Sequence, residues 1–153
     1  MGSSTVVDRS IDINLYPTPV TRGFLHMSDE TWAGTPTATT LFCEDLPATV
    51  DFYRRFLGQA PIFEDDSSCV FRIGETMINL LHVQAVPELI DPAPMAAPGV
   101  RAVYTIGVED VDAACARLEG QGIALLNGPM DRPWSIRTAS VQDPSGHVWE
   151  LAR

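Results

Sequence analysis

The 153-residue sequence contains no lysine, and all ten of its basic residues are arginines. Schiff-base catalysis, including pyridoxal phosphate chemistry, requires a lysine amine and is therefore excluded for this sequence. Basic residues are also few beside the 20 acidic ones, which gives a formal net charge of −10. Because phosphate binding needs clustered Lys or Arg, we expect no nucleic-acid partner. The acidic balance favours cationic partners instead.

Long apolar runs and paired cysteines are lacking as well. No run approaches the roughly 18 to 20 residues of a membrane-spanning helix, and the start does not resemble a secretory signal, so no membrane association is expected. The three cysteines, Cys43, Cys69 and Cys115, are odd in number and lack metal-site spacing. This pattern favours a reduced, cytoplasmic setting.

The first residues have the character of a leader. Met1 to Ser4 is a common opening of expression vectors, and His26-Met27 is what a cloning site leaves behind. We therefore predict that residues 1–35 precede the fold and that residues 1–26 are vector-derived. A fused peptide or a genuine extension remains the alternative for the stretch between these two signatures.

The remainder contains one pattern twice. "TATTLFCEDLPATVDFYRRFLGQAPIFE" and "RAVYTIGVEDVDAACARLEGQGIALLN" each run from an alternating strand through an acidic pair into an amphipathic helix, a glycine and another strand. Asp45 and Asp110 stand where helix N-caps belong. Strands are predicted after the two helices, at 62–64, 69–73 and 76–83, and at 124–126, 136–141 and 147–152. We predict an α+β fold of tandem βαβββ modules, with the first at 36–84, a Pro/Ala-rich linker at 85–99 and the second at 100–153.

Two segments carry a family resemblance, "CEDLPATVDFYRRFLG" and "DPSGHVWELA". In this order and spacing, the chain resembles the vicinal oxygen chelate superfamily over residues 36–153. That superfamily includes glyoxalase I, bleomycin-resistance proteins, fosfomycin-resistance enzymes and extradiol dioxygenases. The resemblance implies that two modules pair their curved sheets around a ligand cleft, and that the protein forms a homodimer.

The resemblance also implies four metal-ligand positions, of which two lie on the first strands and two near the ends of the last strands. Counting seven residues back from Asp45 and Asp110 gives Ala38 and Val103, whose side chains cannot bind a metal. The last-strand positions are Asn79 and Glu150. Since catalytic metals need about three protein ligands, we predict no cofactor and no metal site. A residual divalent-metal site (Zn, Ni, Mn or Fe) that uses Glu150 is the alternative.

Strand alternation sorts the side chains that line the predicted cleft. The expected ligand-binding residues are Ala38, Thr40, Phe42, Asn79, Val103, Thr105 and Glu150, with Trp134 and Arg137 at the rim. Leu41, Cys43, Ile106 and Val108 should face the helices, and Trp149 should lie in the core. His147 lies three residues before Glu150, so the two should point to opposite faces.

Three functions fit this pocket. The first is a metal-independent binding protein of the bleomycin-resistance type, which sequesters an organic, cationic or planar metabolite or antibiotic. The second is a lyase or isomerase acting on a carbonyl compound, with Glu150 as the catalytic base and Asn79 or Thr105 as the oxygen stabiliser. The third is a vestigial cleft in which Glu150 pairs with Arg72 or Arg137. Trp134 could stack on the ligand or pack across a domain or dimer contact.

Overall fold

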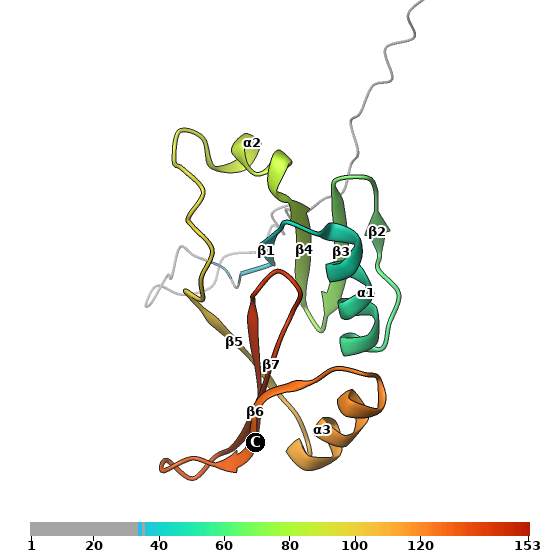
Figure 1. Ribbon diagram of the computed structural model, residues 1–153, viewed down its shortest axis with the longest axis vertical. Helices are drawn as coiled ribbons and strands as arrows, with labels where there is room; N and C mark the ends of the chain where they lie inside the picture. Colours follow the sequence, from blue (N-terminus) through green and yellow to red (C-terminus); the bar gives the residue numbers. More distant parts are fainter. Residues whose placement is uncertain (1–33, 35) are drawn as a thin grey trace, which may run out of the picture.

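The computed structural model describes residue 34 and residues 36–153, coloured along the chain in Figure 1. The prediction of a vector-derived leader at 1–26 lies outside the described residues. Within the described part, no helix is long and apolar enough to cross a membrane.

The first half forms a four-stranded mixed sheet with one helix. Its elements are β1 (Ala38–Cys43), α1 (Leu46–Leu57), β2 (Phe63–Glu64), β3 (Ser68–Ile73) and β4 (Thr76–His82). The strand order is β1-β4-β3-β2, with β1 and β4 parallel and the other neighbours antiparallel. The first and last strands of the module therefore lie side by side.

The second half repeats this topology. Its elements are β5 (Val103–Gly107), α3 (Val111–Gly120), β6 (Leu125–Asp131), β7 (Arg137–Gln142) and β8 (Val148–Ala152), in the sheet order β5-β8-β7-β6. The predicted α+β fold of tandem βαβββ modules is confirmed. Strand β6 runs further than the predicted 124–126, and its pairing with β7 shifts register between Leu125 and Met130.

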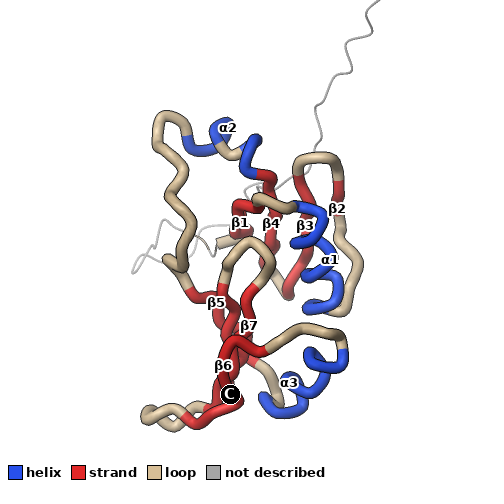
Figure 2. The backbone as a smooth tube through the Cα atoms, in the orientation of Figure 1, coloured by secondary structure: helices blue, strands red, loops and turns tan. Residues whose placement is uncertain are grey.

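The connection between the sheets contains structure of its own. A 3-10 turn, η1 (Val83–Ala85), leads into the short helix α2 (Pro87–Ile90). From there the chain returns as a loop to β5, as Figure 2 shows in tan.

Both long helices begin at the residues that the sequence indicates. Asp45 Oδ1 accepts the Ala48 N–H and Asp110 Oδ1 accepts the Ala113 N–H, each at 3.0 Å. These bonds satisfy amides that the first turn of a helix leaves without partners. Helix α1 ends at Gly58, whose φ of 65° is left-handed and favours glycine.

One hydrophobic core joins the two halves. Leu41 and Cys43 are buried on the helix-facing side of β1, and Ile106 packs against the same core from β5, as alternation predicts. Helix α1 contributes Tyr53, which meets Trp149 of β8 edge to face with ring centroids 6.2 Å apart. The helix-facing sides of both sheets thus share one core, and Figure 1 shows α1 and α3 on the same side of the sheets.

Hydrogen bonds between the helices and the opposite halves reinforce this arrangement. Arg117 Nη2 of α3 donates to the Phe56 carbonyl of α1 at 2.6 Å. Arg55 Nη1 of α1 donates to the Gln121 carbonyl at 2.9 Å. The sheet faces away from the helices carry Thr40 and Asn79 in the first module and Thr105 and Glu150 in the second.

Candidate functional site

Strand register places one polar pair on each sheet. Thr40 of β1 lies opposite Asn79 of β4, and Thr105 of β5 lies opposite Glu150 of β8. Both pairs join the first and last strands of a module in the same parallel arrangement. Asn79 is therefore the structural counterpart of Glu150.

The first pair, Thr40 and Asn79, is closed to solvent at its amide. Asn79 is only 6% exposed, and its Oδ1 accepts a hydrogen bond from Ser68 Oγ at 2.7 Å. Its Nδ2 donates to Thr40 Oγ1 at 3.4 Å, a long bond. Since both ends of the amide already have partners, its burial carries no unsatisfied polar atom.

The second pair, Thr105 and Glu150, is open to solvent. Thr105 Oγ1 donates to Glu150 Oε1 at 3.2 Å, and Glu150 is half-buried. On the same face of β5, Val103 is 55% exposed and Gly107 is exposed as well. This face of the second sheet, which carries Val103, Thr105, Gly107 and Glu150 and is called the open face below, therefore presents a carboxylate among exposed strand residues.

Glu150 does not pair with the arginines that the sequence suggested. Arg137 binds Asp112 through two nitrogens, at 2.6 and 2.8 Å, and Asp131 at 2.9 Å. Its guanidinium lowers the pKa of Asp112 mainly through the side-chain hydrogen bond. Across residues 36–153 Arg72 takes part in no ion pair. The ion pair that the vestigial-cleft alternative offered, between Glu150 and Arg72 or Arg137, is not formed, and Asp112 and Asp131 hold Arg137 instead.

The side chains at the four family ligand positions do not fit a metal ion. Ala38 and Val103 have no donor atom, and the Asn79 oxygen is already occupied by Ser68. No group of three or more His, Cys, Asp or Glu side chains that could hold a metal occurs in the described part of the chain. Glu150 is left as one ligand where about three are needed.

The predicted ligand residues are divided between different places in the chain. Phe42 lines a cavity beside the loop before β5, and Arg137 lines a second cavity near the α3 N-terminus. Neither cavity is lined by Thr40, Asn79, Thr105 or Glu150. The polar pairs are therefore not part of either cavity.

Trp134 lies on the surface and lines neither cavity, so its rim position stays a prediction. Its side chain is 63% exposed, and the Arg132 guanidinium carbon lies 6.0 Å from its ring centroid. Cation–π pairs at exposed sites contribute about 0.5 to 1 kcal/mol. The ring therefore remains available to a ligand or a partner.

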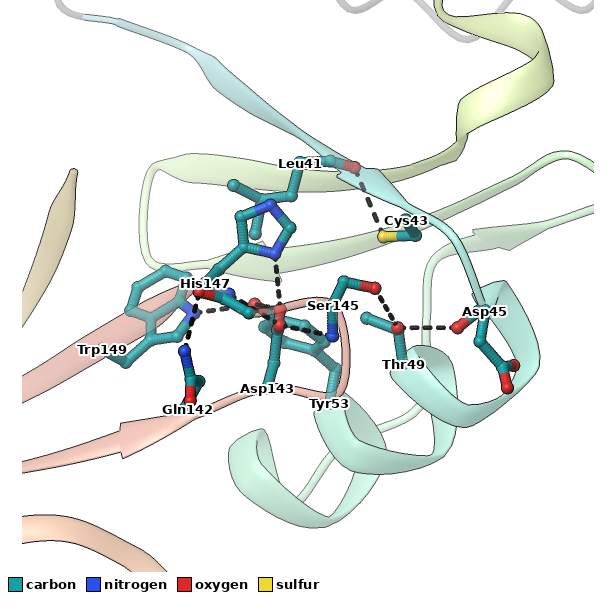
Figure 3. Close-up of polar contacts among 11 residues, drawn as sticks. Leu41, Cys43, Asp45, Thr49, Tyr53, Gln142, Asp143, Ser145, His147 and Trp149 are labelled. Carbon is teal, nitrogen blue, oxygen red and sulfur yellow. Dashed lines mark hydrogen bonds and ion pairs between the residues drawn. The ribbon is translucent and has the colours of Figure 1, made fainter. Parts of the chain in front are cut away.

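A polar cluster that the sequence patterns did not reveal surrounds Asp143, in the turn between β7 and β8 (Figure 3). The Asp143 side chain is fully buried and accepts the Tyr53 hydroxyl at 2.9 Å. It also accepts the backbone N–H groups of Ser145 and His147, each at 2.9 Å. The carboxylate therefore fixes the turn and connects it to helix α1.

Two aromatic partners complete this cluster. His147 Nδ1 lies 2.8 Å from Asp143 Oδ2, and Trp149 Nε1 donates to the Tyr53 hydroxyl at 2.7 Å. Burial raises the pKa of Tyr53, so its hydroxyl stays protonated and donates to Asp143. The "DPSG" turn contained the signal, since Asp commonly accepts amides two residues on, but its contact with Tyr53, 90 residues away, was not readable.

The duplicated topology and the matched registers define a tandem βαβββ protein of the vicinal oxygen chelate type. The chain belongs to the Glyoxalase/Bleomycin resistance protein/Dioxygenase superfamily, whose family model it matches over residues 35–151. No curated protein matches the chain.

Solved structures share the fold. A glyoxalase-related enzyme from Fulvimarina pelagi is 27% identical with a TM-score of 0.68, and covers 78% of this chain and 88% of its own. A glyoxalase/bleomycin resistance protein/dioxygenase from Nocardioides is 28% identical with a TM-score of 0.68, at 78% and 83% coverage. A lactoylglutathione lyase from Agrobacterium tumefaciens is 21% identical with a TM-score of 0.64, at 78% and 93%, which supports the fold alone.

Proposed function

We propose that this protein binds and sequesters a small organic molecule without a metal, as the bleomycin-resistance members of its superfamily do. The observation that carries the proposal is the donor set on the sheet faces. Ala38 and Val103 offer no metal ligand, and Asn79 is buried and hydrogen-bonded, so Glu150 is the charged group of the open face. A half-buried carboxylate among uncovered sheet residues suits a planar cation.

The same proposal includes a homodimer, because the open face needs a second wall. Val103 is 55% exposed, and Thr105 and Gly107 on the same face of β5 are also exposed. A second copy that covers this face would turn it into a groove around Glu150. The proposed setting is the reduced cytoplasm, which suits three free, buried cysteines.

A lyase or isomerase is the second candidate, favoured by the 3.2 Å contact between Thr105 and Glu150. In that role Glu150 would take a proton from a carbonyl compound, while a neighbouring hydroxyl holds the carboxylate in position. Residual metal binding by Glu150 belongs to this candidate.

Ligand binding with matched probes tests the first proposal. Proflavine, a planar cation, should bind in calorimetric titration, and acridone, a neutral planar tricycle of similar size, should bind more weakly. Glu150→Gln should weaken the affinity for proflavine by roughly 10- to 100-fold, since a hydrogen bond to a charged group contributes roughly 1.5 to 3 kcal/mol. Glu119→Gln removes the same charge from the exposed side of α3 and should have no effect.

Metal stoichiometry separates the two candidates. The untagged protein is offered Zn, Ni, Mn, Co and Fe separately, dialysed and assayed for bound metal beside Glu150→Gln. Near-stoichiometric metal that the variant loses would overturn the metal-independent proposal. Equal binding of proflavine and acridone would overturn the cationic ligand class.

A further inference from the structure

The Asp143 cluster holds an imidazole in one defined orientation. His147 Nδ1 faces the buried Asp143 carboxylate at 2.8 Å, and the His147 side chain is 21% exposed. A carboxylate only accepts hydrogen bonds, so Nδ1 carries a proton. In the neutral ring, Nε2 is then left as an acceptor, and no described residue hydrogen-bonds to it.

His147 is one of the residues that line a cavity of about 220 Å³ at the junction of the two modules. Phe42 comes from β1, Tyr104 from β5 and Val100 from the loop between the modules. Cavities of about 150 Å³ hold benzene, whereas drug-sized ligands take roughly 300 Å³ or more. The space therefore suits a molecule built on a single ring.

The polar side chains of the lining are His147, Ser145, whose hydroxyl is hydrogen-bonded to Thr49, and the exposed pair of opposite charges Glu44 and Arg101. Of these, His147 and Glu44 offer acceptors to a ligand that donates a hydrogen bond. Phe42 and Tyr104 offer aromatic surface, against which another ring packs favourably. A phenol hydroxyl or a ring N–H meets both requirements.

We propose that this junction cavity is a second binding site, for a single-ring aromatic molecule whose hydroxyl or N–H donates to His147 Nε2. The site is distinct from the open face, because Tyr104 lies next to Thr105 along β5 and points to the opposite side of the sheet. Asp143 acts as a positioning residue here. The inference does not depend on the function proposed for Glu150.

Fluorine NMR with 4-fluorophenol and 4-fluoroanisole tests the proposal on the full chain. In 4-fluoroanisole a methyl group replaces the hydroxyl proton of 4-fluorophenol, so the probe keeps the ring but cannot donate, and the phenol should bind roughly 5- to 10-fold more tightly. His147→Phe keeps a ring but removes the acceptor, and the two affinities should converge. Asp66→Asn, at an exposed site outside the cavity, should preserve the difference.

If His147→Phe is poorly folded, two further measurements test the site without that variant. Val100→Trp fills the cavity from an exposed loop and should abolish phenol binding. The ring ¹⁵N signal of His147 Nε2 should shift on addition of 4-fluorophenol and stay unchanged with 4-fluoroanisole. Equal binding of the probes, or no binding at millimolar concentration, would overturn the site. If Glu150→Gln weakened 4-fluorophenol binding and His147→Phe did not, the phenol would bind at the open face. That result would refute the junction site and leave the function proposed for Glu150 standing.

Discussion

The two modules place equivalent polar residues on equivalent strands, yet one pair is closed and the other is open. Asn79 is 6% exposed and hydrogen-bonded to Ser68, whereas Glu150 is half-buried beside exposed Thr105. A neutral amide can be buried once its hydrogen bonds are satisfied, but an unpaired carboxylate needs water or a counter-charge. The difference shows how one duplicated scaffold can bury the polar pair of one sheet and leave that of the other exposed.

The largest expected change in the free energy of unfolding comes from removing Asp143, which connects the two modules through Tyr53. Asp143→Ala leaves the Tyr53 hydroxyl and the Ser145 and His147 amides without their acceptor. Each unsatisfied buried donor costs about 1 to 3 kcal/mol, so we expect a loss of roughly 3 kcal/mol in the free energy of unfolding. Urea unfolding measures it. Asp66→Ala is the exposed control, and a loss below about 1 kcal/mol would show that the modules do not depend on this bridge.

Placing a carboxylate at position 79 and an amide at position 150 tests whether the two polar pairs differ in burial as described. Asn79→Asp places a charge in a closed site and should cost about 2 kcal/mol, whereas Glu150→Gln should change stability by less than about 0.5 kcal/mol. The Asn79→Asp penalty should shrink as acid protonates the new carboxyl. Equal effects at both positions would remove the distinction between closed and open faces.

The buried thiols predict a decline of stability in alkali. Burial raises the pKa of Cys43 to about 11 and that of Cys69 to about 12, and it also raises the pKa of Cys115. Below about pH 9 the thiols are protonated in both states, so the native state keeps its full stability. Above about pH 9 the unfolded chain releases protons that the native state retains, and stability falls as the pH rises through about 11 to 12.

Thiol labelling provides the measurement. At pH 8 Ellman's reagent should react slowly with the native protein and rapidly with all three cysteines in denaturant, since the thiolate is the reactive form. Rapid labelling of a native cysteine would indicate that the core around it opens. Melting curves between pH 8 and 11 check the stability trend.

The smallest effect is expected at Trp134. Because this ring is 63% exposed, Trp134→Ala should change the free energy of unfolding by less than about 0.5 kcal/mol. Proflavine titration of the same variant then tests the predicted rim role. A stability loss above about 1 kcal/mol that depends on protein concentration would assign Trp134 to a contact between copies instead.

The sequence predicted the features that depend on periodicity and local chemistry. The alternation along β1 and β5 sorted Leu41 and Cys43 from Thr40, and the caps at Asp45 and Asp110 located both helices. Counting along the last strands reached Asn79, which the strand register pairs with Thr40 as Glu150 is paired with Thr105.

Features that depend on how distant elements meet were not predictable. Periodicity indicates which face of α1 is buried, but not that Tyr53 would reach Asp143. Arg137 was placed at a ligand rim, yet its planar guanidinium is held by Asp112 and Asp131. The cavity beside His147 needs β1, β5 and the connecting loop together, and no single stretch of sequence encodes it.

The pairing of first with last strands also sets the order in which the chain can fold. Strand β1 pairs with β4, and β5 pairs with β8. Each sheet can therefore form completely only after the last strand of its module has been synthesised. Pairing between strands distant in sequence is slow, because the intervening loop must be ordered first. During synthesis the first module can close while the second is still emerging, whereas Trp149 and Asp143, which cover Tyr53, arrive only with the second module. Until then the side of α1 that carries Tyr53 lacks its cover and exposes apolar surface, which favours aggregation.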